Sequence, residues 1–571
     1  MRRNASAGPG WAVGLAVLGI ALNAVCVAHA APLPGREPDL GPVQQAEPRL
    51  HPPRTFNSDL ALDVLARLPD GRMRRIGRTP AARPLAIPEC RWWAVEPVDE
   101  TTPADLAREV AAKHIPGLRL HRNADKFLAE SEHLERLQFL WLFERAVTDS
   151  TLARLKGLTN LQKLDIRGST VTGEGLVHLA GLTGLRELAL WGTKVSGEGL
   201  ADLAELKNLR KLGLGWTDVT DACLVHLAGL TGLQEVGLRG TKVSGEGLAD
   251  LAELKNLRKL DLGRTDITGD SLLHLAALTG LRELVLQGPE TVTDLCLAHL
   301  KGLTELHVLD LGYNKITDAA LVHLEPLTNV RELYLEETRI THDGLAHLKG
   351  LTEMRVLDLK YTRVTDAGLV HLAELTELRV LNLELTEVTG PGLAHLKGLE
   401  NLHELNLAWT SVTDSGLAHL AGLTNLRKLD LTGTEATDAG LAHLNELINL
   451  RELKLKGTWI TDDGLAHMAG LTNLRNVDLS LTEVTNAGLA HLKGLTSLRR
   501  LDLFETQVTE RGLRALRADL PDLAAIRVSP APDGFLYTVG EYLVTASMYL
   551  VGPLSVFLWL AFVLLKRRGA Q

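Results

Sequence analysis

A single repeat governs what this chain can fold into. The element [VI]-T-x-x-x-L recurs every 24 residues, with one step of 25 residues across positions 287–291. A period in the twenties with leucine at fixed offsets is typical of a stacked solenoid, in which each unit buries its apolar face only against its neighbours. Such an array builds a long, shaped surface, which favours a binding function. With serine for threonine in the third and fifth copies and alanine for valine at position 436, the element begins at Val147, Val171, Val195, Val219, Val243, Ile267, Val292, Ile316, Ile340, Val364, Val388, Val412, Ala436, Ile460, Val484 and Val508.

One unit shows why the repeat folds. Leu164 and Ile166 alternate with polar residues, which predicts a short strand with one buried face. Thr172 then stands at a helix start, where we expect its side chain to cap the helix. The leucines that follow at helical spacing, from Leu176 to Leu182, form a second buried stripe. A strand, a turn and a short helix within 24 residues predict parallel strands along one edge of the stack and helices along the other.

These motifs resemble the leucine-rich repeat family. Its pattern L-x-x-L-x-L-x-x-[N/T/C] is matched by residues 185–193, and the resemblance covers roughly positions 118–528. The T-D-x-G-L helix start at 365–369 resembles the cysteine-containing subclass and exported bacterial members. The resemblance implies an α/β leucine-rich-repeat solenoid, with a curved parallel sheet on its concave face and short helices on its convex face.

The two ends of the chain predict export and anchoring. Arg2 and Arg3, the apolar run 11–27 and a small-x-small site ending at Ala30 indicate a signal peptide. The uncharged stretch 542–565 is long enough to span the ~30 Å hydrocarbon core. Basic residues 566–568 would stay in the cytoplasm, which places the repeats on the extracytoplasmic side, periplasmic or extracellular. Whether the C-terminal segment is a permanent anchor or a processed sorting tag stays open.

We therefore expect this domain organisation: 1–30 signal peptide, 31–103 proline-rich linker or irregular N-terminal segment, 104–136 N-terminal cap, 137–529 solenoid of about 16 to 17 repeats, 530–541 juxtamembrane segment, 542–565 transmembrane helix and 566–571 cytoplasmic tail.

A hydroxyl follows nearly every strand and is expected to bond turn backbone from inside the solenoid. This threonine ladder consists of Ser169, Thr193, Thr217, Thr241, Thr265, Asn314, Thr338, Thr362, Thr386, Thr410, Thr434, Thr458, Thr482 and Thr506. A histidine on the helix side also recurs. Neighbours in that histidine series could share a metal ion, but a packing or hydrogen-bonding role copied with the repeat is favoured. The series is His178, His226, His274, His299, His323, His347, His371, His395, His419, His443, His467 and His491.

Outside the repeats the sequence contains no nucleophile elbow, phosphate loop or zinc-spaced Cys/His set. We therefore expect no enzymatic activity, no catalytic or metal-binding residues and no cofactor. A net charge of −9 does not favour nucleic acid as a partner.

Residues that depart from the repeat consensus on the outward strand positions predict the binding surface. Solvent-facing aromatics on a concave sheet are typical of protein or glycan recognition, and several glutamates lie beside them. The candidate partner-binding residues are Trp191, Trp216, Tyr313, Tyr334, Glu336, Tyr361, Glu384 and Trp409. We expect a protein or glycan ligand at this face, and membrane contact through the C-terminal helix. A non-specific envelope scaffold is the alternative, and an enzyme is the least favoured.

Overall fold

The computed structural model describes residues 50–98, 101–129, 134–143, 145–288 and 292–528. These residues divide into two compact units. One contains the residues up to Thr102 with Ile115–Leu118, and the other contains Pro103–His114 and the residues from Arg119 onward. The predicted signal peptide and the predicted transmembrane helix lie outside the described residues. Within the described ranges, no helix has the length and apolar character needed to cross a membrane.

The first unit corrects the expectation of an irregular segment at 31–103. Strand β2 (Leu62–Arg67) pairs antiparallel with β3 (Met73–Thr79) on one side and with β5 (Trp92–Pro97) on the other. Strands β1 (Arg54–Phe56) and β4 (Leu85–Ile87) form a second antiparallel pair, and β6 (Gly117–Leu120) pairs with β5 at Val95. The prolines stand between or at the ends of these strands, where a missing N–H is tolerated. The fully buried ring of Trp93, in contact with Phe56, fills the core of this unit.

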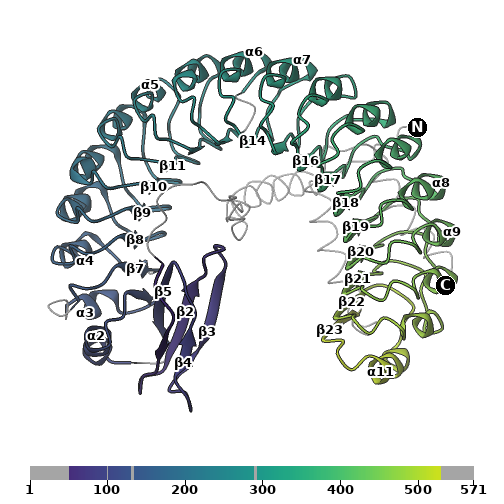
Figure 1. Cartoon of the computed structure of the whole chain (residues 1–571), viewed down its shortest axis with the longest axis horizontal. Coiled ribbons are helices and arrows are strands. Elements are labelled where there is room, and N and C mark those ends of the chain that lie inside the picture. Colours follow the sequence, from purple (N-terminus) through teal and green to yellow (C-terminus); the bar gives the residue numbers. More distant parts are fainter. Residues whose placement is uncertain (1–49, 99–100, 130–133, 144, 289–291, 529–571) are drawn as a thin grey trace, which may run out of the picture. The chain divides into compact units, whose positions relative to one another are not determined.

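The second unit confirms the solenoid. Seventeen parallel strands are seen in its described residues, each hydrogen-bonded to the next along the chain. They line the inner side of the curve (Figure 1). Most are only three residues long because the chain must turn toward the helix within 24 residues. The strands are β7 (Phe139–Leu142), β8 (Lys163–Asp165), β9 (Glu187–Ala189), β10 (Lys211–Gly213), β11 (Glu235–Gly237), β12 (Lys259–Asp261), β13 (Glu283–Val285), β14 (Val308–Asp310), β15 (Glu332–Tyr334), β16 (Val356–Asp358), β17 (Val380–Asn382), β18 (Glu404–Asn406), β19 (Lys428–Asp430), β20 (Glu452–Lys454), β21 (Asn476–Asp478), β22 (Arg500–Leu503) and β23 (Ala525–Val528).

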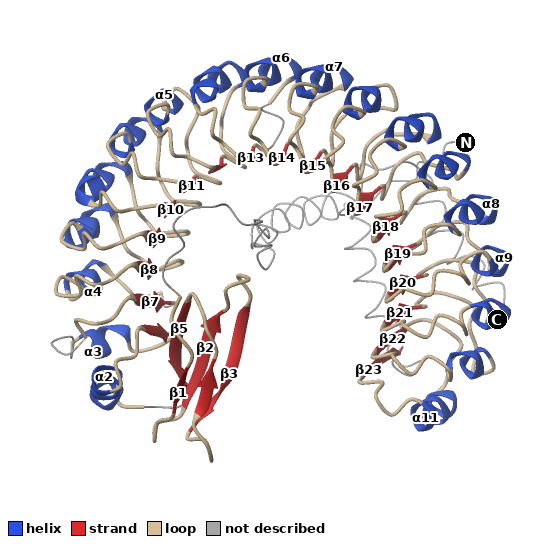
Figure 2. Ribbon diagram, viewed as in Figure 1, coloured by secondary structure: helices blue, strands red, loops and turns tan. Residues whose placement is uncertain are grey.

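Short helices cover the outer side of the curve (Figure 2). Many of them are 3₁₀ turns, because so little chain is left for a helix in each unit. The helical segments are α2 (Pro103–Ala112), α3 (Ala124–Leu128), α4 (Asp149–Ala153), η2 (Gly173–Leu179), η3 (Gly197–Glu205), η4 (Asp221–Leu227), α5 (Leu248–Leu251), η5 (Gly269–Ala277), α6 (Asp294–Leu297), η6 (Ala298–Leu300), α7 (Asp318–Leu321), η7 (Val322–Leu324), η8 (Gly344–Leu348), η9 (Asp366–Leu372), η10 (Pro391–Leu396), α8 (Asp414–Leu417), η11 (Ala418–Leu420), α9 (Asp438–Ala442), α10 (Asp462–His467), η12 (Gly488–Leu492) and α11 (Glu510–Asp519).

Leucines from both sides fill the space between strands and helices. Leu381 is an example: it is fully buried and stands in parallel register between Leu357 and Leu405 of the adjacent strands. The threonine ladder has the expected structural role. In twelve units the threonine Oγ1 donates to the carbonyl three residues earlier at 2.5–2.8 Å. Asn314 replaces the hydroxyl after the 25-residue step and donates to the carbonyls of Leu286 and Leu311.

Thr172 stands at the N-cap of η2, as predicted, but its side chain forms no hydrogen bond with the helix. Its Oγ1 donates instead to Asp149 Oδ2 of the preceding unit at 2.7 Å, and its amide donates to Asp149 Oδ1 at 2.8 Å. We call this paired contact the Asp–Thr clasp. It recurs between Asp294 and Thr317, Asp318 and Thr341, Asp414 and Thr437, Asp438 and Thr461, and Asp462 and Thr485.

The clasp also explains the glycine of T-D-x-G-L. A Cβ added to Gly464 would overlap the carboxylate of Asp438, and one added to Gly488 would overlap that of Asp462. The glycine therefore lets the aspartate of the preceding unit approach the helix start. The motif is a contact between successive repeats, which no single unit of the sequence reveals.

Candidate functional site

The concave sheet presents two outward positions on each strand and two more in the turn that follows it. Tyr334 and Asp358 occupy the second outward strand position of β15 and β16. Glu336 and Glu384 lie in the turns after β15 and β17, at one and the same position of the repeat. We call Asp310, Tyr313, Tyr334, Glu336, Asp358, Tyr361 and Glu384 together the acidic–aromatic surface. Its residues come from four successive units, β14 to β17, so the sheet brings them side by side.

Several of the predicted aromatics share an unusual backbone conformation. Tyr313, Tyr361, Trp216 and Trp409 have φ of 60°, 57°, 56° and 58°, in the left-handed region. The equivalent residue is glycine in five other units, from Gly168 to Gly457. A side chain in this conformation costs roughly 1–2 kcal/mol, which glycine avoids. Leu385, Leu481 and Glu505 hold the same conformation at this position, so it is a property of the repeat turn and not of the aromatic residues alone.

The tryptophans have a second role within the array. A Cβ added to Gly240 would overlap the indole of Trp216, and one added to Gly433 would overlap that of Trp409. Trp191 lies in the same way against Gly215. Each indole therefore packs over the glycine of the next turn, which holds the ring in place. Trp216 still keeps 37 % of its surface exposed, and Tyr313 keeps 38 %.

The carboxylates of the surface are crowded and half-buried. Burial raises the pKa of Glu336 to about 7, and the carboxylates of Asp310 and Asp358 add to the rise. Burial also raises the pKa of Asp310 to about 6. Glu336 Oε1 accepts a hydrogen bond from Gln287 at 3.1 Å, whereas its Oε2 is buried with no hydrogen-bond partner among the described residues. This oxygen is an acceptor that an incoming donor could satisfy.

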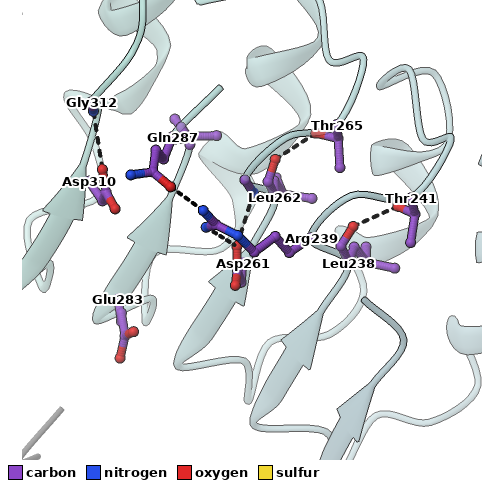
Figure 3. A network of polar contacts seen from close by, with 12 residues as sticks. Leu238, Arg239, Thr241, Asp261, Leu262, Thr265, Glu283, Gln287, Asp310 and Gly312 are labelled. Carbon is purple, nitrogen blue, oxygen red and sulfur yellow. Dashed lines mark hydrogen bonds and ion pairs between the residues drawn. The ribbon is translucent and has the colours of Figure 1, made fainter. Parts of the chain in front are cut away.

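A polar network links this surface to the preceding repeats, and Figure 3 shows the part of it formed by Arg239, Asp261 and Gln287. Arg239 donates to the side-chain oxygen of Gln287 and lies 3.8 Å from Asp261. Gln287 in turn donates to Glu336, so one amide connects a guanidinium and a carboxylate that are four units apart. Asp310 accepts from the Gly312 amide at 3.1 Å in the same row of turns. The network fixes the direction in which Glu336 points.

The other acids of the surface have partners. Glu384 lies 3.3 Å from Lys360 Nζ and accepts from Asn406 at 3.0 Å. Asp358 accepts from Asn382 at 3.0 Å, and the Tyr334 hydroxyl donates to Glu332 at 2.8 Å. Glu336 therefore differs from its neighbours in keeping a buried oxygen without a partner.

The structure thus brings together only part of the predicted set. Tyr313, Tyr334, Glu336, Tyr361 and Glu384 lie in adjacent units. Trp191 and Trp216 follow β9 and β10, five and four units before β14, whereas Trp409 follows β18, in the unit directly after that of Glu384. Sequence reasoning missed Asp310 because it looks like an ordinary repeat position, and it noted Gln287 only as the start of the 25-residue step. The left-handed turn was detectable in principle, since glycine recurs there.

The histidine series lies on the helix side and is half-buried to exposed. His347 Nδ1 contacts Glu325 Oε1 of the preceding unit at 2.7 Å. No group of three or more metal-ligating side chains occurs in the part of the chain that the structure describes.

The comparison with protein families agrees with this architecture. The family described as "Leucine-rich repeat region" matches residues 238–529, just over half of the chain, and the family "Leucine Rich repeat" matches residues 157–180. No curated protein sequence matches the chain.

Solved leucine-rich-repeat structures are similar at low sequence identity. An internalin, InlF, from Listeria monocytogenes is 22 % identical with a TM-score of 0.41, covering 58 % of this chain and 89 % of its own. A leucine-rich-repeat protein of Leptospira interrogans is 20 % identical with a TM-score of 0.42, covering 72 % and 90 %. InlJ of Listeria monocytogenes is 19 % identical with a TM-score of 0.45, covering 66 % and 72 %. With the family matched over more than half of its length, the chain belongs to the leucine-rich repeat family.

Proposed function

We propose that this chain is a non-enzymatic binding protein that holds a protein partner on its acidic–aromatic surface. The observation that carries the proposal is Glu336, whose Oε2 is buried and unpartnered among the described residues beside Tyr313 and Tyr361. A buried carboxylate oxygen without a donor costs free energy in the unbound protein. A lysine, arginine or amide donor from a partner removes that cost, and the tyrosine rings provide contact area around it.

The outward strand positions of the N-terminal repeats differ from the acidic–aromatic surface, and this difference supports placing the partner on that surface. In the first outward position of the N-terminal repeats, lysine and glutamate alternate and neutralise each other. The contacts are Lys163–Glu187 at 2.6 Å, Lys211–Glu235 at 2.5 Å and Lys259–Glu283 at 2.5 Å. Val308, Val356 and Val380 interrupt this alternation beside the acidic–aromatic surface. The Lys–Glu alternation of the first outward position therefore stops at this surface.

We also propose that the protein is exported and held in the membrane by residues 542–565, with the repeats on the extracytoplasmic side. The support is the sequence pattern of the two ends: Arg2 and Arg3 before an apolar run, and a basic triplet after an uncharged one. Protease added to intact cells or spheroplasts should digest the repeats. A reporter fused after Gln571 that is active only in the exported compartment would overturn the orientation.

The binding function is tested by capture of partners on the full-length chain, followed by affinity measurements on variants. Tyr334→Ala or Tyr361→Ala should weaken binding by ~2 kcal/mol at a true hot spot, with the fold almost unchanged. Glu336→Gln removes the charge at nearly constant shape and should weaken a cationic partner.

His371→Ala and His395→Ala serve as controls because both side chains lie on the helix side. If the histidine variants lose the partner while the tyrosine variants keep it, the binding face lies on the convex side. A neutral glycan that binds the wild type and is insensitive to Glu336→Gln would favour glycan recognition. If no partner is captured, the alternative of a non-specific envelope scaffold gains support.

A further inference from the structure

The carboxylate of Glu336 is held in a crowded position by the side chains and turns around it. Glu336 lies back over the turn of the preceding unit, since a Cβ added to Gly312 would overlap its carboxylate. Arg239 lies forward over the turn of the next unit, against Gly263, in the same way. Both side chains therefore reach Gln287, which is hydrogen-bonded to each of them (Figure 3 shows the bond to Arg239).

Negative charge exceeds positive charge around Glu336. Its carboxylate accepts from the neutral amide of Gln287 and is repelled by Asp310 and Asp358 of the adjacent strands. Arg239 attracts the carboxylate of Asp310 but donates to Gln287 and not to Glu336. The charged and titratable groups that units β11 to β16 place around this carboxylate are Arg239, Asp261, Arg264, Asp310, Tyr313, Glu337, Asp358 and Lys360.

The two other cations of this group are directed elsewhere. Lys360 lies 3.3 Å from the carboxylate of Glu384, and Arg264 acts on the phenol of Tyr313. Among the described residues, the Oε2 oxygen of Glu336 has no hydrogen-bond partner. Glu336 is therefore crowded by like charges without a cation of its own.

This crowding makes two carboxylates titrate near neutral pH. Burial, which is the largest cause, and repulsion by Asp310 and Asp358 raise the pKa of Glu336 to about 7. Burial likewise raises the pKa of Asp310 to about 6, against the attraction of Arg239. Both groups are mostly charged at pH 8 and mostly protonated at pH 5, so the surface loses negative charge over this interval.

We propose that the acidic–aromatic surface holds a cationic partner at neutral pH and releases it in mild acid. This inference rests on the proposed function and adds its regulation. A lysine or arginine of the partner donates to Oε2 of Glu336 while the carboxylate is charged. When Glu336 and Asp310 take up protons, that attraction is lost and the affinity falls. Because the partner binds the charged form, its binding in turn expels a proton from the surface.

The histidines of the chain are the main alternative source of a pH effect. They gain positive charge over the same interval and would repel a cationic partner from the whole molecule. A substitution of Glu336 keeps every histidine in place. Comparing that variant with the wild type therefore separates a local switch on the concave face from a change in net charge.

The test uses labelled tetralysine with a blocked N-terminus, because its side chains stay protonated up to about pH 10. Its affinity for the purified full-length chain is measured at low salt at pH 8 and pH 5. The wild type should bind about tenfold more weakly at pH 5, where the charge-assisted hydrogen bond to Glu336 is lost. Glu336→Gln should bind weakly at pH 8 already and should lose most of the pH dependence.

A second measurement detects the expelled proton. Calorimetry at pH 7 in buffers of different ionisation enthalpy should show proton release when tetralysine binds the wild type, and less release with Glu336→Gln. The matched control is Glu404→Gln, which removes one carboxylate from a strand outside the acidic–aromatic surface. Glu404 is paired with Lys428 at 2.8 Å, so this control should keep the affinity and the pH dependence of the wild type.

The outcomes separate the switch from the proposed function on which it rests. Equal affinity of the wild type at pH 8 and pH 5, or a pH dependence that Glu336→Gln retains in full, overturns the switch and leaves the binding surface in place. An equal loss of pH dependence in Glu404→Gln also overturns it, because the effect then follows net charge. Absence of tetralysine binding at pH 8 refutes cationic recognition by this surface and, with it, the switch. Unchanged far-UV circular dichroism at both pH values shows that the proteins are folded.

Discussion

Removing one Asp–Thr clasp tests whether these contacts stabilise the stack. Asp438 accepts from the Thr461 amide at 2.8 Å and from Thr461 Oγ1 at 2.6 Å. A hydrogen bond to a charged group contributes roughly 1.5–3 kcal/mol, and Asp438 is half-buried, so water compensates part of the loss. Asp438→Ala should therefore lower the free energy of unfolding by about 2–3 kcal/mol. Guanidinium unfolding followed by circular dichroism measures this change, and faster hydrogen exchange of the Thr461 amide localises it.

The chain supplies its own control for this experiment. Asn486 replaces the aspartate in the last clasp, where it accepts from the Thr509 amide at 2.9 Å and donates to Thr509 Oγ1 at 2.9 Å. An asparagine can therefore keep both hydrogen bonds by reversing one of them. Asp438→Asn should cost less than about 1 kcal/mol. If the alanine variant is as stable as the wild type, or if asparagine is as damaging as alanine, the clasp does not hold successive repeats together.

Three further perturbations test the leucine core, the clasp glycine and the acidic site. Leu381→Ala should cost roughly 2–5 kcal/mol in a denaturant titration, because the side chain is fully buried; a value near zero contradicts that burial. Gly464→Ala should cost about 1–3 kcal/mol, because the new methyl group overlaps Asp438, and Asp438→Ala in the same chain should relieve part of that cost. The raised pKa of Glu336, about 7 against an ordinary 4.5, means that the folded state binds its proton more tightly than the unfolded state. The stability that this group contributes is complete below pH 4.5 and is lost as the pH rises through 7. The free energy of unfolding of Glu336→Gln should therefore fall less steeply than that of the wild type between pH 4.5 and 7. If the free energy of unfolding changes with pH equally in both proteins, the raised pKa of Glu336 is refuted.

The solenoid was predictable because its signal is repeated. Each leucine position recurs many times, so a departure such as Ala436 does not obscure the period. The N-terminal unit has no such redundancy. Its strands are short, its prolines are frequent, and its core depends on non-local contacts such as that of Trp93 with Phe56. A single pass along the sequence therefore predicted an irregular segment where the structure has an antiparallel sheet.

Contacts between successive repeats are the second feature that could not be predicted from the sequence. The sequence shows a threonine before each helix, and capping is the usual role of such a residue. The carboxylate that actually accepts from Thr461 belongs to Asp438, 23 residues earlier. Thr461 Oγ1 also accepts from the Asp463 amide at 3.3 Å, so it caps its own helix as well, and local patterns reveal only that capping role. The glycine of the motif, Gly464, carried the missing information, since an exposed helix start has no need of glycine unless something packs against it.

The same reasoning separates the tyrosines of the candidate site from its tryptophans. Trp216 and Trp409 each lie against a glycine of the following turn, so part of their role is to stabilise the array. Tyr313 is in the same left-handed conformation, yet the residue one unit later is Glu337, also left-handed, and not a glycine that could receive the ring. Trp216 and Trp409 therefore pack over the next turn, whereas the Tyr313 hydroxyl is hydrogen-bonded to the Glu337 carboxylate there. Tyr313 keeps 38 % of its surface exposed beside Glu336, which makes this tyrosine and not the tryptophans the better marker of the proposed binding surface.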